Sequence, residues 1–539
     1  MATSGALPPQ TLLINLFLVS SCIWTGCTQS TPQGTTAYEP APEGSAPSSE
    51  DAGLWDGAEQ APDTGGDLVD AGLEDVPGDL GADLNQTDVE DVEDVEGVED
   101  VEDVEDSGTP SFDPVSIPEA TFLWPMGVAS GAMTSDSFLV WGYTEDVSDW
   151  TLMVWRSVDG QAQIVHEETV ETGRDGYIKV RVRGLDAGVW YTYAFFLGDE
   201  DRGLSARSEI GEVRTALGPE SMEVLTLGAS TCTNTPYAPF ESMIETAAQD
   251  IDLFVHLGDM SYNDSANDLG AYRDKWRETL EDPGYRAILS AAGLYMTWDD
   301  HEITNNWDPE RIDEQRLRDA KQAYFETLPV ERFEDDRLWT SYRWGQTAEI
   351  FVLDGRSERR PSTINDDAPI YISPEQMNWL QGGLINSESH FKILLNSVPI
   401  TRMPPLWLSA DDRWQGYGAQ RQELIDFIID NDIHNVFFLT GDFHTGFVSH
   451  VEPEGEGRRI WEVAVGPGGN GPNPLAILAD TGMLGRELVF PSSQFLYGSS
   501  LMEVMTTLTF DPVENNVRVR FVDALTFEVR FDQVISEDD

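Results

Sequence analysis

The sequence predicts a layered α/β domain that is preceded by a β-sandwich domain and a disordered acidic tether. Three observations support this. The first 107 residues contain 25 acidic residues and no Lys or Arg. The next hundred residues alternate apolar and polar positions in short runs, and the remainder alternates apolar runs with helical segments. The expected boundaries are 1–27 for a signal segment, 28–117 for the linker, 118–217 for the β-sandwich and 218–539 for the α/β domain.

The N-terminus has the features of an export signal. Residues 11–24 are apolar over the length of a signal peptide rather than of a membrane-spanning helix. Thr25-Gly-Cys27 has the form of a bacterial lipobox, and Val19-Ser-Ser-Cys22 fits the same pattern, so either cysteine is a candidate for lipidation, with Cys27 favoured. A plain signal peptide with incidental cysteines is the alternative. We therefore expect an exported lipoprotein of the cell envelope or surface.

The linker is rich in Pro, Gly, Ser and acidic residues and ends in Val-Glu-Asp triplets that run to Asp106. A period of three buries no face of a helix or strand, and like charges repel, so we expect an extended, disordered tether. The net charge of the whole chain is −65. That charge opposes binding of a nucleic acid backbone and favours bound cations.

Residues 118–217 predict a sandwich of the immunoglobulin or fibronectin type III kind. Alternating runs at 137–142, 150–155 and 189–196 are separated by Gly and Asp turns at the expected spacing. Aromatic residues at alternate positions indicate sheet packing, and a glycan-binding surface is the alternative.

The α/β domain has helical segments at 315–328 and 419–429 between its apolar, strand-like runs. These runs end at polar residues, namely Cys232, Asp259, Asp299 to His301, Asp354, Asn396, and Asp442 followed by His444. Ligands of open α/β sheets bind beyond the carboxyl ends of the strands, so we expect these side chains to meet in one crevice.

Such a gathering of anions requires cations. The carboxylates of Asp259, Asp300 and Asp442 would repel one another and become protonated unless metals neutralised them. With a Cys232 thiolate and a Tyr262 phenolate the site has five negative charges, which one trivalent and one divalent ion would balance. The mixture of soft and hard ligands favours two unlike metals.

Five motifs in this domain resemble the alkaline phosphatase D (PhoD-like) family of calcineurin-like metallophosphoesterases, which is related at its site to purple acid phosphatases. They are Gly258-Asp-Met-Ser-Tyr262, Trp298-Asp-Asp-His-Glu-Ile-Thr-Asn-Asn306, Asp354-Gly-Arg356, Asn396-Ser-Val-Pro399 and Gly441-Asp-Phe-His444. The preceding domain, with Gly127-Val-Ala-Ser-Gly131 near its start, is similar to the domain that these enzymes carry. The resemblance covers about 122–533.

The resemblance implies a phosphomonoesterase with a two-metal site, in which a metal-activated hydroxide attacks phosphorus in line. It implies Fe³⁺ on Cys232, Asp259, Tyr262 and His444, and Ca²⁺ on Asp300, Asn396 and Asp442, with Asp259 bridging the two ions. Asn305 or Asn306 is an alternative to Asp300.

Two residues are candidates for catalysis. His301 would protonate the departing alkoxide as a general acid, and a buried structural histidine is the alternative. Arg356 follows a strand end, where it would either clamp a phosphate oxygen or pair with Asp354.

We expect small phosphate esters as substrates, a monomer, and contact with a membrane only through the lipid anchor. A phosphodiesterase acting on lipid, polymer or nucleotide diesters would use the same metals, and an insert at 402–418 that narrows the entrance would favour the monoesterase. An inactive surface-binding lipoprotein is the alternative from another class. The stretch Gly466-Pro-Gly-Gly-Asn-Gly471 lacks the Lys-Ser/Thr and the following helix of a P-loop, so we interpret it as a loop near the site.

Overall fold

The computed structural model describes residues 112–539 with the exception of 174 and 200–202. The signal segment, both candidate lipidation cysteines and the linker up to residue 111 lie outside the described residues. Among the helices that are described, none combines the length and the apolar character that a membrane span requires.

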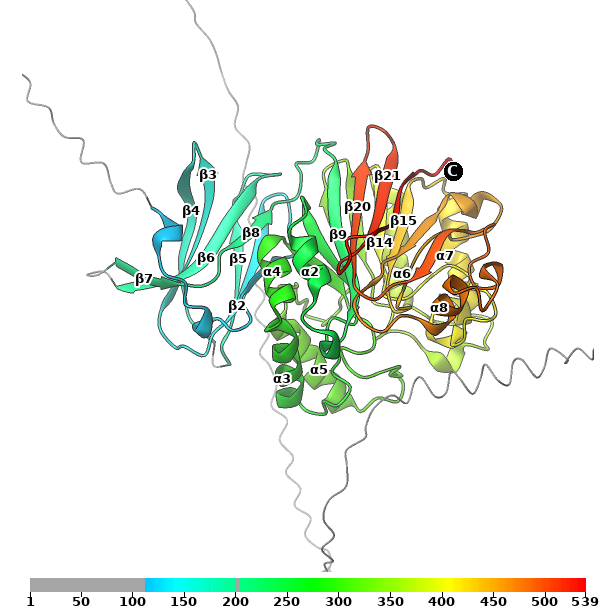
Figure 1. Cartoon of the computed structure of the whole chain (residues 1–539), viewed down its shortest axis with the longest axis horizontal. Coiled ribbons are helices and arrows are strands. Elements are labelled where there is room, and N and C mark those ends of the chain that lie inside the picture. The colour runs from blue at the N-terminus through cyan, green and yellow to red at the C-terminus, as the bar shows by residue number, and fades with distance from the viewer. Residues whose placement is uncertain (1–111, 174, 200–202) are drawn as a thin grey trace, which may run out of the picture. The chain divides into compact units, whose positions relative to one another are not determined.

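The strands of the described chain form three sheets (Figure 1). The largest has ten strands and contains parallel β9, β10 and β11 at its centre. Its order is β22 (Val529–Ile535), β21 (Asn516–Asp523), β20 (Val504–Asp511), β9 (Leu225–Thr233), β10 (Leu253–Leu257), β11 (Leu294–Thr297), β1 (Val128–Gly131), β2 (Ser137–Tyr143) and β5 (Tyr177–Arg183), with β18 (Pro467–Gly469) on β9.

The second sheet has seven strands, of which β13, β14, β15 and β17 are parallel. Its order is β12 (Thr340–Trp344), β13 (Ala348–Val352), β14 (Phe391–Leu395), β15 (Val436–Thr440), β17 (Trp461–Ala464), β16 (Thr445–His450) and β19 (Phe495–Ser500). The third sheet lies in the N-terminal domain and is antiparallel. It consists of β4 (Gln161–Val170), β3 (Trp150–Val158), β6 (Trp190–Asp199), β7 (Gly203–Arg207) and β8 (Gly211–Arg214).

Most of the described α-helices begin at a side-chain cap. Asp268, Asp282, Asp313, Ser373 and Asn473 each accept a backbone N–H of the first turn, and three of these helices have Pro at their first position. The helices are α2 (Glu241–Ala247), α3 (Leu269–Leu280), α4 (Pro283–Ala291), α5 (Glu314–Thr327), α6 (Pro374–Asn386), α7 (Gly418–Asp430) and α8 (Pro474–Asp480).

Apolar side chains of the two large sheets share one buried cluster, which includes Leu227 and Val255 of the first sheet and Ile393 and Leu439 of the second. A second cluster packs α3, α4 and α5 with β10 and β11, and a third packs α6 and α7 with β13, β14 and β15. This arrangement fixes the parallel strands, and therefore their ends, in a buried and closely packed core.

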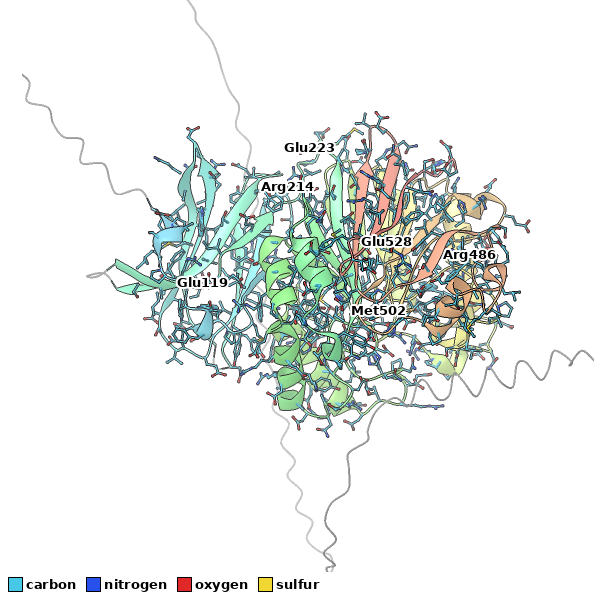
Figure 2. The ribbon with its side chains drawn as sticks, in the orientation of Figure 1. Glu119, Arg214, Glu223, Arg486, Met502 and Glu528 are labelled. Carbon is cyan, nitrogen blue, oxygen red and sulfur yellow. The ribbon has the colours of Figure 1, made fainter. Side chains whose placement is uncertain are left out.

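The N-terminal domain joins the first sheet directly. Gly131 at the end of β1 pairs with Leu294 of β11, so β1, β2 and β5 continue the large sheet. A Cβ at Gly131 would lie 2.4 Å from the Pro329 carbonyl oxygen, so this approach requires glycine. Arg214 of β8 also contacts Asp252 at 2.5 Å and Glu223 at 2.7 Å, and Figure 2 labels Arg214 and Glu223. The sequence predicted a separate sandwich but not this continuous sheet.

The predicted α/β class is confirmed at the level of mixed sheets with helices. The helices predicted at 315–328 and 419–429 correspond to α5 and α7, which each begin one residue earlier. Cys232 is the penultimate residue of β9, and each of the other predicted strand ends in the α/β domain follows an observed strand, from β10 to β15.

Candidate metal centre

Four of the predicted ligands have left-handed backbone at the ends of strands. The φ angles of Cys232, Asp259, Asp442 and His444 are 52°, 57°, 64° and 49°. This region is uncommon for residues other than Gly, and strain of this kind persists mainly where the surrounding structure enforces it at functional sites. The backbone therefore turns sharply at these four predicted metal ligands.

The first group of ligands lies where β9, β10 and β15 end. Single ligand atoms of Cys232, Asp259 and His444 all lie within 4.8 Å of one another. Cys232 Sγ is 3.5 Å from Asp259 Oδ2. The Tyr262 hydroxyl is 3.3 Å from Asp259 Oδ2 and 3.4 Å from His444 Nε2. Sulfur, nitrogen and oxygen donors from both large sheets therefore converge on one point.

The predicted ligands of the second ion, which are Asp300, Asn396 and Asp442, adjoin the first group through Asp259. Ligand atoms of Asp259, Asp300 and His301 also lie within 4.8 Å of one another. Asn396 directly follows β14 and Asp442 follows β15, and these two strands are parallel neighbours. The two alternatives to Asp300, Asn305 and Asn306, are exposed, and Asn306 instead donates its backbone N–H to Asp300.

The electrostatics of this cluster is unfavourable for a chain without cations. Burial raises the pKa of Asp259 and of Asp442 well above the ordinary value, and neighbouring carboxylates raise both further. Burial and the Asp259 carboxylate likewise raise the pKa of the Cys232 thiol. Burial opposes ionisation of Asp300, but Arg356 and His301 lower its pKa to about 2. A cation would replace the protons that this cluster otherwise retains.

The residues present fit two unlike cations. Within the described chain, the buried atoms Asp300 Oδ1 and Asn396 Oδ1 accept no hydrogen bond. A buried acceptor without a partner is costly, so such an oxygen is a ready ligand for a hard cation. The group around Cys232 instead offers a soft sulfur donor together with a harder imidazole nitrogen and oxygens.

His301 lies at the edge of the cluster with its side chain 17% exposed. Its Nδ1 is 2.8 Å from Asp264 Oδ2, and its ring stacks on Tyr262 with the ring centroids 4.0 Å apart. Burial alone would lower the pKa of His301, but Asp259, Asp300 and Asp264 raise it to about 10. The imidazole is therefore partly accessible, fixed in orientation and supplied with a proton, unlike a buried structural histidine.

The side chain of Arg356 is fully buried and pairs with two carboxylates. Its Nε is 2.5 Å from Asp299 Oδ1 and its Nη1 is 2.6 Å from Asp412 Oδ1. Asp354, the partner considered from the sequence, instead accepts the backbone N–H of Arg356 at 3.0 Å. The clamp on a phosphate oxygen stays a prediction. Nη2 is the one nitrogen of the Arg356 guanidinium that has no hydrogen-bond partner among the described residues.

Three residues at the site were not predicted from the sequence, namely Asp264, Glu302 and Asp412. Glu302, which is 1% exposed, accepts the backbone N–H groups of Met260 and Asp299 and so holds two of the turns together. Glu302 follows His301 in the same motif, which was a signal available in the sequence. Asp264 and Asp412 act through contacts between distant segments, for which the sequence contains no signal.

Comparison with known proteins gives a consistent result. The family model described as PhoD-like phosphatase matches residues 227–475, and that of the PhoD-like phosphatase N-terminal domain matches residues 116–217. Alkaline phosphatase D of Bacillus subtilis (strain 168) is 26% identical over 426 residues, which is 66% of this chain and 72% of that protein.

Two solved structures share the fold. A structure of PhoD matches with a TM-score of 0.64 at 22% identity, over 77% of this chain and 90% of that chain. A purple acid phosphatase from seeds of yellow lupin (Lupinus luteus) matches with a TM-score of 0.53 at 14% identity, over 76% of this chain and 73% of that chain.

Proposed function

Because the chain belongs to the PhoD-like phosphatase family and is a hydrolase of phosphoric esters, we propose that it is an exported, metal-dependent phosphomonoesterase. The family that the motifs predict is confirmed, and the alternative of an inactive surface-binding lipoprotein is set aside. The observation that supports metal dependence is the convergence of Cys232, Asp259 and His444 ligand atoms within 4.8 Å.

The proposed metals are Fe³⁺ on the group of Cys232 and Ca²⁺ on the group of Asp300. Fe³⁺ suits the mixed sulfur, nitrogen and oxygen donors, and Ca²⁺ suits the uncharged and charged oxygens. The ligand sets are Cys232, Asp259, Tyr262 and His444 for the first ion, and Asp259, Asp300, Asn396 and Asp442 for the second. When bound, the two cations supply Lewis acidity toward water and toward the phosphoryl oxygens.

The protein's own groups then position the substrate and move a proton. Asp264 accepts a hydrogen bond from Nδ1 of His301, which leaves Nε2 to donate a proton to the departing alkoxide. Tyr262 restricts the imidazole from one face by stacking. Arg356 neutralises Asp299 beside the metal ligands and thereby limits repulsion within the cluster.

Export and anchoring complete the proposal. The apolar segment at 11–24 and the cysteines at 22 and 27 favour a lipoprotein of the cell envelope. The net charge of −65 favours a monomer that acts on small phosphate esters rather than on nucleic acid. Its test is labelling of the exported protein with a radioactive fatty acid, which a chain without Cys22 and Cys27 must not incorporate.

The catalytic proposal is tested with Cys232→Ala and Asp259→Ala. Each should lose metal and reduce the hydrolysis of a phosphate monoester by roughly 10³-fold or more, because the bound metals contribute several kcal/mol to transition-state stabilisation. Glu528→Ala is the control, because this residue is exposed on the loop before β22 and is labelled in Figure 2. An active, metal-replete Asp259→Ala protein would remove the assignment.

The substrate class is tested with mono- and bis-nitrophenyl phosphate. The segment at 402–418 is held firmly, since Arg413 donates to the carbonyl oxygens of Trp407 and Leu408, and Asp412 binds both Arg356 and Arg359. A fixed insert beside the site favours the smaller monoester. Faster hydrolysis of the diester would establish the phosphodiesterase alternative.

A further inference from the structure

The glycine-rich segment 466–471 lies against the strand that carries Cys232. Its β18 pairs in parallel with β9 through Pro467 to Thr231 and Gly469 to Thr233, which are the two neighbours of Cys232. A Cβ at Gly468 would lie 2.4 Å from Ser230 Oγ, so this approach requires glycine. The glycines therefore serve close packing against the metal centre and not a P-loop.

Asn470 is the first residue after β18, and it is 6% exposed. Its backbone N–H donates to the carbonyl oxygen of Met502, a residue labelled in Figure 2. Its Oδ1 accepts the backbone N–H of Gly471 at 2.7 Å, so the amide nitrogen Nδ2 faces the other way. Nδ2 lies 2.6 Å from the hydroxyl oxygen of Tyr262. Because an amide nitrogen only donates, the Tyr262 oxygen is the acceptor in this hydrogen bond.

The same segment contacts a second predicted ligand. The carbonyl oxygen of Gly471 lies 3.0 Å from Nδ1 of His444. A hydrogen bond from Nδ1–H leaves the lone pair on Nε2, which is the atom that faces Tyr262. One short segment thus donates to one predicted ligand of the first metal and accepts from another.

We propose that segment 466–471 is a positioning element of the first metal site, in which Asn470 donates a hydrogen bond to the ligating oxygen of Tyr262. The inference rests on the proposed function, because it requires Tyr262 to bind the ferric ion. A ferric ion would hold Tyr262 as its phenolate, with the phenol proton passing to solvent, and this oxygen would then be an acceptor only. A hydrogen bond to a charged group is stronger than one to a neutral group, so Asn470 favours the bound phenolate over the free phenol.

The test uses Asn470→Asp and Asn470→Leu in the full chain, with Asn473→Asp as the matched control. An Asp at 470 keeps the acceptor for Gly471 N–H, loses the donor and places a second anion against the phenolate. Asn473 lies in the same loop, where its Oδ1 caps α8 and its Nδ2 donates to the Phe443 carbonyl oxygen. Its one hydrogen bond to a predicted ligand among the described residues runs from its backbone N–H to the His444 carbonyl oxygen, and the substitution keeps this bond. The control therefore makes the same chemical change beside the site.

Each protein is loaded with Fe³⁺, and two quantities are measured. The first is iron retention in competition with a chelator, which we expect to weaken roughly 10- to 100-fold in both Asn470 variants, the range seen when a partner of a metal ligand is removed. The second is the visible charge-transfer band from phenolate to Fe³⁺. We expect this band to move to longer wavelength in Asn470→Leu, because a phenolate without its donor holds its electrons less tightly. Asn473→Asp should keep both properties.

The outcomes separate this inference from the proposed function. Wild-type protein that retains no iron overturns both. Wild-type protein with a bound ferric ion, and Asn470 variants with unchanged retention and an unchanged band, overturn the inference alone. Thermal unfolding of the metal-free proteins separates a general loss of folding from an effect on the site. If the Asn470 variants lose iron only because their metal-free form is less stable, and the charge-transfer band does not move, the inference is also contradicted.

Discussion

Arg356 permits a test that separates a structural role from a catalytic one. In Arg356→Met a side chain of similar length remains, but the guanidinium that binds Asp299 and Asp412 is lost. The side chain of Asp299 is 1% exposed and pairs with no other cationic side chain of the described residues, whereas Asp412 retains Arg359 at 2.7 Å. The substitution therefore leaves one carboxylate buried and unpaired.

The magnitude follows from that burial. Removing one partner of a buried ion pair typically costs about 3–5 kcal/mol, because the remaining charge keeps its desolvation penalty. The double variant Arg356→Met with Asp299→Asn removes that charge as well. It should recover about 1–3 kcal/mol relative to the sum of the two single changes, as expected for residues in direct contact.

The assay is urea unfolding of the metal-free proteins, together with kcat and KM for a phosphate monoester. We expect Arg356→Met to lower the free energy of unfolding strongly, and the double-mutant cycle to show a positive coupling. We expect KM to change less than 10-fold, because no guanidinium atom is exposed to the substrate. A stable Arg356→Met protein whose KM rises 10-fold or more would refute this reasoning and establish the phosphate clamp.

Three further predictions concern other parts of the site and core. Asp264→Ala should slow hydrolysis of an alkyl phosphate by roughly 10²-fold but leave dinitrophenyl phosphate nearly unaffected, because only a poor leaving group needs the general acid His301; equal loss on both esters contradicts this role. Burial lowers the pKa of His256 to about 3, so its contribution to stability is complete above pH 6.5 and is lost as the pH falls below that value. Between pH 7 and 5 the free energy of unfolding of the wild type should therefore fall by about 2 kcal/mol more than that of His256→Gln, and parallel plots of this free energy against pH would exclude the effect. Gly258→Ala should destabilise the protein by about 1–3 kcal/mol, because φ is +95° and the new Cβ would lie 2.5 Å from that of Asp299; an unchanged melting temperature would refute it.

The sequence was most informative for features that depend on one continuous segment of the chain, such as a single strand or helix. The run that leads to Asp259 is apolar apart from His256 and is followed by Gly and Asp, and the structure has β10 and a left-handed turn at these positions. Likewise, the periodic apolar residues of α5 and α7 predicted both helices to within one residue at their starts.

Contacts between distant segments were not predictable in this way. Asn470 and Tyr262 are 208 residues apart in the chain, and neither position has a pattern that indicates the other. For Arg356 the sequence left two roles open, a clamp on a phosphate oxygen or a pair with its neighbour Asp354, and neither includes Asp299 and Asp412, which the fold places against its guanidinium. The large sheet is extended by the pairing of β1 with β11, and this pairing involves only Gly131 and Leu294, which is too short a match to leave a pattern in the sequence.

The most direct test of the metal centre is elemental analysis of the purified wild-type protein, combined with chelation and add-back while phosphate release is measured. We expect one iron and one calcium ion per chain, loss of activity when a chelator removes them, and recovery when both are returned. Full activity in protein that contains neither metal would contradict this expectation.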